Sequence, residues 1–163
     1  HLPFLLAASD KYIKPAVRYQ GCAYDSGVDF LLPNQYFTLW STSDSQIHST
    51  LETFASAGEQ LEDLAISKED LRGYILSAYA QALPPSGMLN GRMRFLRRRL
   101  FGISTDHINK MIMDIRNSSL KDQRTAAKLI HKILQNSPAA VVGNEKLIEE
   151  NKDLFDEVMK LQS

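Results

Sequence analysis

The feature that most constrains the fold is a change of hydrophobic period near residue 24. Up to residue 17, apolar side chains recur at helical spacing, whereas residues 24 to 32 alternate with a period of two. A period of two is typical of a β-strand with one buried face. Residues 33 to 35 then predict a turn, and residues 36 to 42 form a second β-rich run, so the sequence predicts a hairpin.

Helices are predicted on both sides of the hairpin. The first, over residues 3 to 18, is expected to break near Pro15, because proline cannot donate to the helical hydrogen-bond ladder. Apolar stripes and caps predict the later elements. These are a helix over 47 to 61 after Asp44 and Ser45, a helix opened by Ser67 with Asp70 and stopped at 84 to 87, a helix through Met93 and Leu100, a helix capped by Thr105, a helix opened by Ser119 with Asp122, a short strand over 138 to 142, and a final amphipathic helix with Leu154, Phe155, Val158 and Leu161.

This order of elements predicts an α+β, two-layer fold, in which helices pack on one face of a largely antiparallel sheet. Three strands make a thin sheet for so many helices. We therefore expect either that more strands precede His1 in a parent protein or that a partner completes the sheet. Each option leaves an exposed sheet edge, through which self-association is a further expectation.

Composition sets broad limits on the partners. The 19 basic and 19 acidic residues cancel, so the chain has no overall field to attract nucleic acid or an anionic membrane. No apolar run approaches the roughly 18 residues that span a bilayer, and no membrane partner is expected. The single cysteine, Cys22, favours an intracellular setting such as a bacterial cytoplasm or an organelle. The apolar start continues at helical spacing, which favours an excised domain over a signal peptide.

Motifs for metal or nucleophilic chemistry are missing from the sequence. The four histidines are well separated, and neither His-x-x-Glu-His nor its reverse occurs, so we expect no metal site in this chain. Cys22 has no histidine near it in sequence, and a buried structural role is the commoner one. No nucleophile elbow or phosphate loop appears. A Ser-His-Asp set assembled from distant positions stays open.

The strongest local charge is a run of five arginines, Arg92, Arg94, Arg97, Arg98 and Arg99. Such a helix could follow a phosphate backbone. Only Phe95 and Phe101 could stack on bases nearby, so nucleic-acid binding ranks last. A solvated helix face is the favoured interpretation, and docking onto an acidic face of a neighbouring domain is intermediate.

Arg18 and Tyr24 lie on either side of a turn that contains Gly21, with Arg18 at a helix end and Tyr24 at a strand start. A guanidinium group and a phenol are donors suited to holding a peptide carbonyl or a developing oxyanion. On spacing alone, an arginine lying along the helix end and a tyrosine packed on the sheet are favoured.

Several segments, taken in order, resemble a known family. Residues 17 to 24, residues 36 to 41 with Ser43-Asp44, the helix leading to residues 84 to 86, and residues 141 to 144 resemble presequence peptidases and falcilysin-like enzymes of the pitrilysin and insulinase superfamily. The resemblance implies that residues 1 to 163 are one partial C-terminal α/β domain of a zinc metalloendopeptidase that degrades unfolded peptides in a closed chamber. The zinc would be bound in the N-terminal part of that parent.

The same resemblance implies the roles of individual residues. Arg18 and Tyr24 would act in catalysis by contacting the peptide substrate near the scissile carbonyl, while the other parent domains supply the zinc site. The chain alone would be inactive. Cys22 and Asp25 replace glycines of the family pattern, and Thr42-Ser43-Asp44-Ser45 lacks its arginine. These departures motivate the alternative of a non-catalytic scaffold or docking domain.

Overall fold

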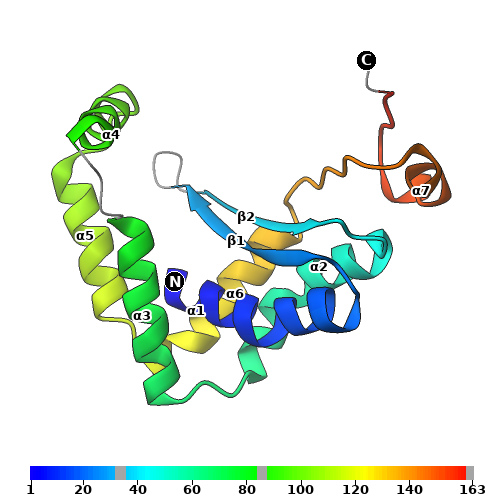
Figure 1. Ribbon diagram of the computed structural model, residues 1–163. Helices are drawn as coiled ribbons and strands as arrows, with labels where there is room; N and C mark the ends of the chain where they lie inside the picture. Colours follow the sequence, from blue (N-terminus) through cyan, green and yellow to red (C-terminus); the bar gives the residue numbers. More distant parts are fainter. Residues whose placement is uncertain (32–35, 84–87, 161–163) are drawn as a thin grey trace.

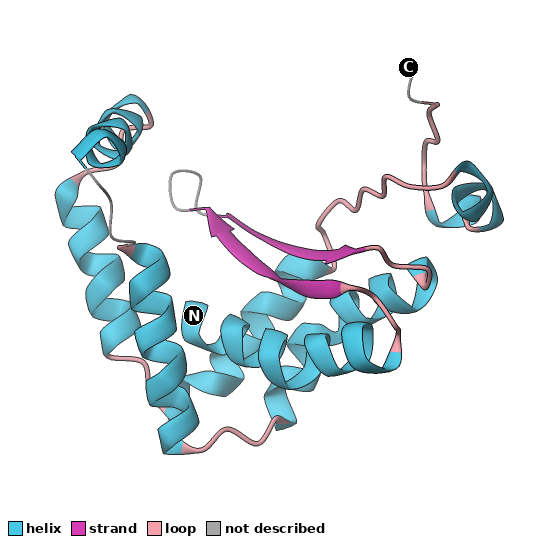
Figure 2. Cartoon of the chain, in the orientation of Figure 1, coloured by secondary structure: helices cyan, strands magenta, loops and turns pink. Residues whose placement is uncertain are grey.

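The computed structural model describes residues 1–31, 36–83 and 88–160, and within them the protein is a mostly helical α+β fold with a two-stranded antiparallel sheet. The hairpin lies across the N-terminal helix, and the helices over residues 47–63 and 123–134 lie on that same side of it (Figures 1 and 2). This confirms the α+β class. The sheet has two strands in the described residues where the sequence predicted three.

The N-terminal helix runs without a break from residue 2 to residue 20, and the expected interruption near Pro15 is wrong. It consists of α1 (Leu2–Ala8), η1 (Ser9–Ile13) and η2 (Pro15–Gln20), of which the last two have wider π-type turns. The Lys14 N–H, for example, donates to the carbonyl five residues back. In an α-helix, a proline ring clashes with the carbonyl group four residues before it. In a π-type turn, the hydrogen bonds join residues five apart, so the backbone around the proline is arranged differently. The helix therefore continues to the turn that leads into the sheet.

The hairpin pairs β1 (Asp25–Leu31) with β2 (Tyr36–Thr42), as the sequence predicted, while residues 32 to 35 of the turn lie outside the described part. On its inner face, the Val28–Leu39 and Phe30–Phe37 pairs pack against the core. The alternating side chains place the Gly27–Trp40 pair on the outer face. A Cβ atom on Gly27 would lie 3.1 Å from the Trp40 ring, so the indole lies across the glycine.

The N-terminal helix forms the centre of the core, between the hairpin and a pair of closely packed helices. Phe4, Ala7 and Ile13 on this helix are fully buried. Beneath them, α2 (Ile47–Asp63) packs against α6 (Gln123–Leu134), with Gly58 directly opposite the backbone of His131. On the other side, α3 (Lys68–Ala82) packs against α1. The hairpin is thus supported by a helix that is itself enclosed by the fold.

The predicted capping boxes are confirmed. Ser67 and Asp70 exchange hydrogen bonds of 3.0 Å at the start of α3. Before α6, at the short η4 (Leu120–Asp122), Ser119 and Asp122 form the second capping box, in which the Ser119 N–H and hydroxyl each donate to Asp122 Oδ2 at 2.8 Å. The cap of α5 (Thr105–Arg116) is Ser104 rather than the predicted Thr105, because the Ser104 hydroxyl accepts a hydrogen bond of 3.1 Å from the His107 N–H.

Two predictions for the C-terminal part are wrong. Residues 138 to 142 are not part of a sheet, since no strand in the described residues lies beside them and a strand depends on such pairing. The final amphipathic helix is also absent from the described residues, of which Leu161 is not one: α7 (Glu145–Glu150) and η5 (Lys152–Leu154) are followed by non-helical chain up to residue 160. Val158 is exposed, and without an apolar surface to cover, a short helix is not stable in water.

Candidate binding site at the edge of the hairpin

The predicted pair Arg18 and Tyr24 flanks the tight turn between the N-terminal helix and β1. The turn is closed by hydrogen bonds from the Gly21 N–H to Ala16 O at 2.8 Å and from the Ala23 N–H to Val17 O at 3.1 Å. A Cβ atom on Gly21 would lie 2.7 Å from Val17 O, so this position requires glycine. The structure therefore places both predicted residues at one end of the hairpin.

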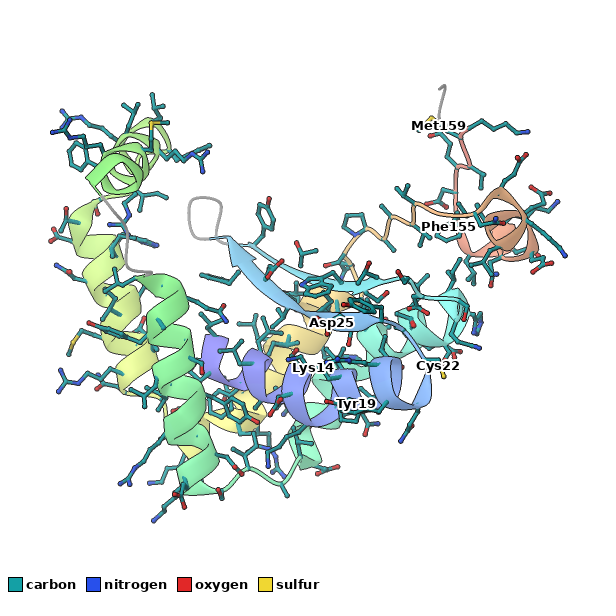
Figure 3. The ribbon with its side chains drawn as sticks, in the orientation of Figure 1. Lys14, Tyr19, Cys22, Asp25, Phe155 and Met159 are labelled. Carbon is teal, nitrogen blue, oxygen red and sulfur yellow. The ribbon has the colours of Figure 1, made fainter. Side chains whose placement is uncertain are left out.

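The side chains around this turn are held loosely and face solvent. Arg18 Nη1 lies 3.6 Å from Asp25 Oδ1, and the guanidinium group stands 5.7 Å from the centre of the Tyr19 ring. Tyr24 is 76% exposed, while its N–H donates to Thr42 O. Figure 3 shows Tyr19, Cys22 and Asp25 where the helix turns back into the strand. A long, exposed ion pair contributes little to stability, so the Arg18 donors remain available for a ligand.

Cys22 takes a left-handed backbone conformation, with a φ of 63°. This conformation costs most residues with a Cβ atom about 1–2 kcal/mol, whereas glycine adopts it freely but loses more entropy on folding. We expect Cys22→Gly to raise the free energy of unfolding by about 1 kcal/mol, measured by urea denaturation. The control is Cys22→Ala, which removes the thiol but keeps the Cβ atom and should give no gain. Equal midpoints for the two variants would contradict the assignment of strain.

A recess of about 380 Å³ extends from Asp25 along β1, between the N-terminal helix and α3. Four consecutive residues of β1 line it, and one residue of β2, Trp40, contributes as well. The other walls are polar at most positions. They consist of Leu6, Ser9, Asp10 and Lys14 from the N-terminal helix and Tyr74, Ser77 and Gln81 from α3.

Hydrogen bonds between the N-terminal helix and α3 fix one wall of the recess. The Tyr74 hydroxyl donates to Asp10 Oδ2 at 2.9 Å, and burial followed by this bond raises the pKa of Tyr74 above its ordinary value. Nearby, Lys11 Nζ donates to Asp70 Oδ2 at 2.9 Å. The hydrogen bond from Lys11, followed by those from Ser67, lowers the pKa of the Asp70 carboxyl to about 2. The recess is therefore bounded by two helices that are tied together.

Two buried polar atoms in the lining lack a hydrogen-bond partner among the residues that the structure describes. They are Ser26 Oγ, in a residue with no exposed surface, and Trp40 Nε1. Most buried side-chain polar atoms in folded proteins have a partner, so two unpaired atoms in one recess indicate a missing ligand or solvent. Of the other buried atoms without a partner, His131 Nδ1 is on α6 and Arg98 Nη2 is on α4 (Met88–Leu100).

The remaining sequence candidates are not brought to this site. The arginine-rich helix α4 lies well away from the hairpin (Figure 1), with Phe95 and Leu100 exposed. Over residues 1–31, 36–83 and 88–160, no group of three or more potential ligands is close enough to hold a metal ion. No helix in the same ranges is both long and apolar enough to cross a membrane. Ser26 and Trp40 were not predicted from the sequence; the facing Gly27 is the signal that could have indicated them.

Comparison with known proteins gives a distant similarity. No family model matches the chain. The chain is similar to the protein named HypA of Clostridium perfringens (strain 13 / Type A), with 26% identity over 148 residues. The matched region covers 90% of this chain and 15% of HypA. The chain thus spans a small part of the length of the curated relative that it matches.

These findings correct the family assignment made from the sequence. The relative found carries the name HypA rather than that of a peptidase. We therefore withdraw the assignment to presequence peptidases and falcilysin-like enzymes, and with it the interpretation of the chain as part of a zinc metalloendopeptidase. The zinc expected in a parent enzyme depended on the same resemblance and is withdrawn too. Arg18 and Tyr24 lie at the turn, and the catalytic role that the resemblance gave them stays a prediction that these findings do not test.

Proposed function

We propose that this chain is an interaction module of a longer protein, and that it binds an extended polypeptide at the end of its hairpin. The observation that carries the proposal is the hairpin itself. Its inner face is packed on the N-terminal helix, while in the described residues no other strand pairs with either of its outer edges. Unpaired edges are surfaces to which another strand can add.

The similarity to HypA supports the first half of the proposal. Most of this chain aligns with a region that makes up 15% of that protein. In a longer protein of this kind, residues 1 to 163 would be a partial domain. No bond cleavage is part of this proposal.

Arg18 and Tyr24 are the residues that we propose contact the bound polypeptide. Their side chains emerge on either side of the turn at the start of β1, and Tyr24 is exposed over most of its surface. An arginine carries five N–H donors, of which the long contact to Asp25 engages few, and a tyrosine hydroxyl can donate or accept. Such groups suit the carbonyl oxygens of a chain that runs past the end of the hairpin.

Photo-cross-linking in the source cells tests whether the chain is part of a longer protein and whether it binds a polypeptide near Tyr24. Tyr24 is replaced by p-benzoylphenylalanine in the intact protein, and Tyr79 on α3, which is also exposed, is replaced in a matched control. We expect a parent band far above the 18.4 kDa of this chain, and a cross-link from position 24 to a defined peptide that the control does not give. A parent band at 18.4 kDa would contradict the longer protein, and equal cross-linking from both positions would contradict the site. A cross-linked product of two identical chains would identify the partner as a second copy.

A further inference from the structure

The recess lies along the free edge of β1. Asp25, Ser26, Gly27 and Val28 all line it, and these residues are consecutive. Because successive side chains of a strand point to opposite faces, a surface that touches all four includes the edge of the strand. The other edge of β1 is paired with β2. The backbone groups along the recess are therefore those that β2 does not use.

Trp40 reaches this free edge although it belongs to β2. Its ring lies across Gly27, with 3.1 Å between a Cβ atom placed on Gly27 and the nearest ring carbon. Its indole nitrogen, which can act as a donor alone, is buried and has no partner in the part of the chain that the structure describes. A larger residue at position 27 would meet the ring, so the glycine gives the indole its place beside the edge.

We infer that the recess binds an extended polypeptide strand, which pairs through its backbone with the free edge of β1 and accepts a hydrogen bond from Trp40 Nε1 through one of its carbonyl oxygens. This inference rests on the proposed function and specifies which edge of the hairpin is used. The four lining residues of β1 span about 13 Å, which matches four residues of an added strand. Ser26 Oγ, the other unpaired atom of the lining, can donate or accept.

The charges around the recess favour a polypeptide over a nucleic acid. Asp10 and Asp25 contribute two carboxylates to the lining, against one ammonium group from Lys14. Because Arg18 Nη1 also lies 3.6 Å from Asp25 Oδ1, the charges here nearly balance and offer a phosphate backbone no net attraction, which a neutral peptide backbone does not need. A more open hollow of about 570 Å³ beside α7 is not a comparable site, because its charged side chains pair with one another, as Lys146 does with Glu150 and Lys160 with Glu145.

The experiment uses the whole 163-residue chain, labelled with nitrogen-15, and a defined peptide. The probe is an acetylated and amidated hexapeptide of alternating valine and threonine, added up to millimolar concentration. We expect amide shifts at residues 25 to 28, a shift of the Trp40 indole N–H signal, and slower hydrogen exchange along β1. Trp40→Phe keeps a ring over Gly27 but loses the donor, and should weaken binding about threefold to tenfold. Ser26→Ala serves as a second variant if Trp40→Phe does not fold.

A matched peptide decides whether the strand edge is responsible. The same hexapeptide with an N-methyl group on every residue cannot donate hydrogen bonds along either of its edges and should give none of these shifts. Equal binding of the methylated peptide, shifts along β2 instead of β1, or no shift at millimolar peptide would each overturn the inference. Cross-links from position 24 without any amide shift along β1 would contradict binding in the recess but would leave the proposed function unaffected. Shifts along β1 without cross-links would overturn the role of Tyr24 and support the recess.

Discussion

Gly58→Ala will lower the free energy of unfolding by about 3 kcal/mol. A Cβ atom at this position would lie 2.5 Å from His131 Cα and 2.8 Å from its Cβ, which is too close for any packed structure. The obstructing atoms belong to the backbone and first side-chain carbon of α6, so no flexible side chain can move aside. The two helices would have to separate, and the buried contacts of Ala57 and Leu61 with α6 would be weakened along with them.

Gly73→Ala is the matched control for this prediction. Gly73 lies within α3, and a Cβ atom there would meet nothing within 4 Å. Since alanine has the higher helix propensity, this variant should be more stable than the wild type by up to about 1 kcal/mol. Urea denaturation of both variants, followed by circular dichroism, measures the two shifts. If Gly58→Ala unfolds at the same urea concentration as Gly73→Ala, α2 and α6 are not in the contact described above.

Local signals in the sequence predicted the elements that local physics determines. The alternation after residue 24 gave the hairpin, and the side chains of Ser67 and Ser119 marked two helix starts that the structure confirms. A prediction also failed where the structure of a segment depends on a partner far away in the sequence. Residues 138 to 142 have the composition of a strand but no neighbouring strand in the described residues. The break predicted near Pro15 failed for a local reason, because the helix continues there through wider π-type turns while the rule for proline applies to the α-helical ladder.

The candidate site likewise has a part that could be predicted from residues close in sequence and a part that could not. Arg18 and Tyr24 are six residues apart and flank one turn, so their common location followed from the sequence. The recess did not, because it combines residues from the N-terminal helix, β1, Trp40 of β2 and α3. That Ser26 Oγ and Trp40 Nε1 are buried without a hydrogen-bond partner can be recognised only in the folded structure, where the hairpin lies over the helix. The family resemblance depended on short, weak segments, and the comparisons did not support it.

Phe4→Ala will destabilise the protein by about 3–5 kcal/mol, because it removes a fully buried aromatic side chain and leaves a cavity that its neighbours fill incompletely. Phe4 belongs to the main hydrophobic cluster, which also includes Leu61 on α2, Ile130 on α6 and the partly buried Val28 and Phe30 of β1. The loss is a large share of the 5–15 kcal/mol that stabilises a typical domain.

The position of Phe4 makes this variant a test of how the hairpin is supported. Leu76→Ala, on the exposed face of α3, is the control and should change the free energy of unfolding by no more than about 0.5 kcal/mol. If the N-terminal helix is the platform on which β1 rests, Phe4→Ala should also speed hydrogen exchange of the β1 amides, while Leu76→Ala should leave it unchanged. A destabilised variant with unaltered β1 exchange would mean that the hairpin is held by other contacts. The recess would then not depend on the helix that forms one of its walls.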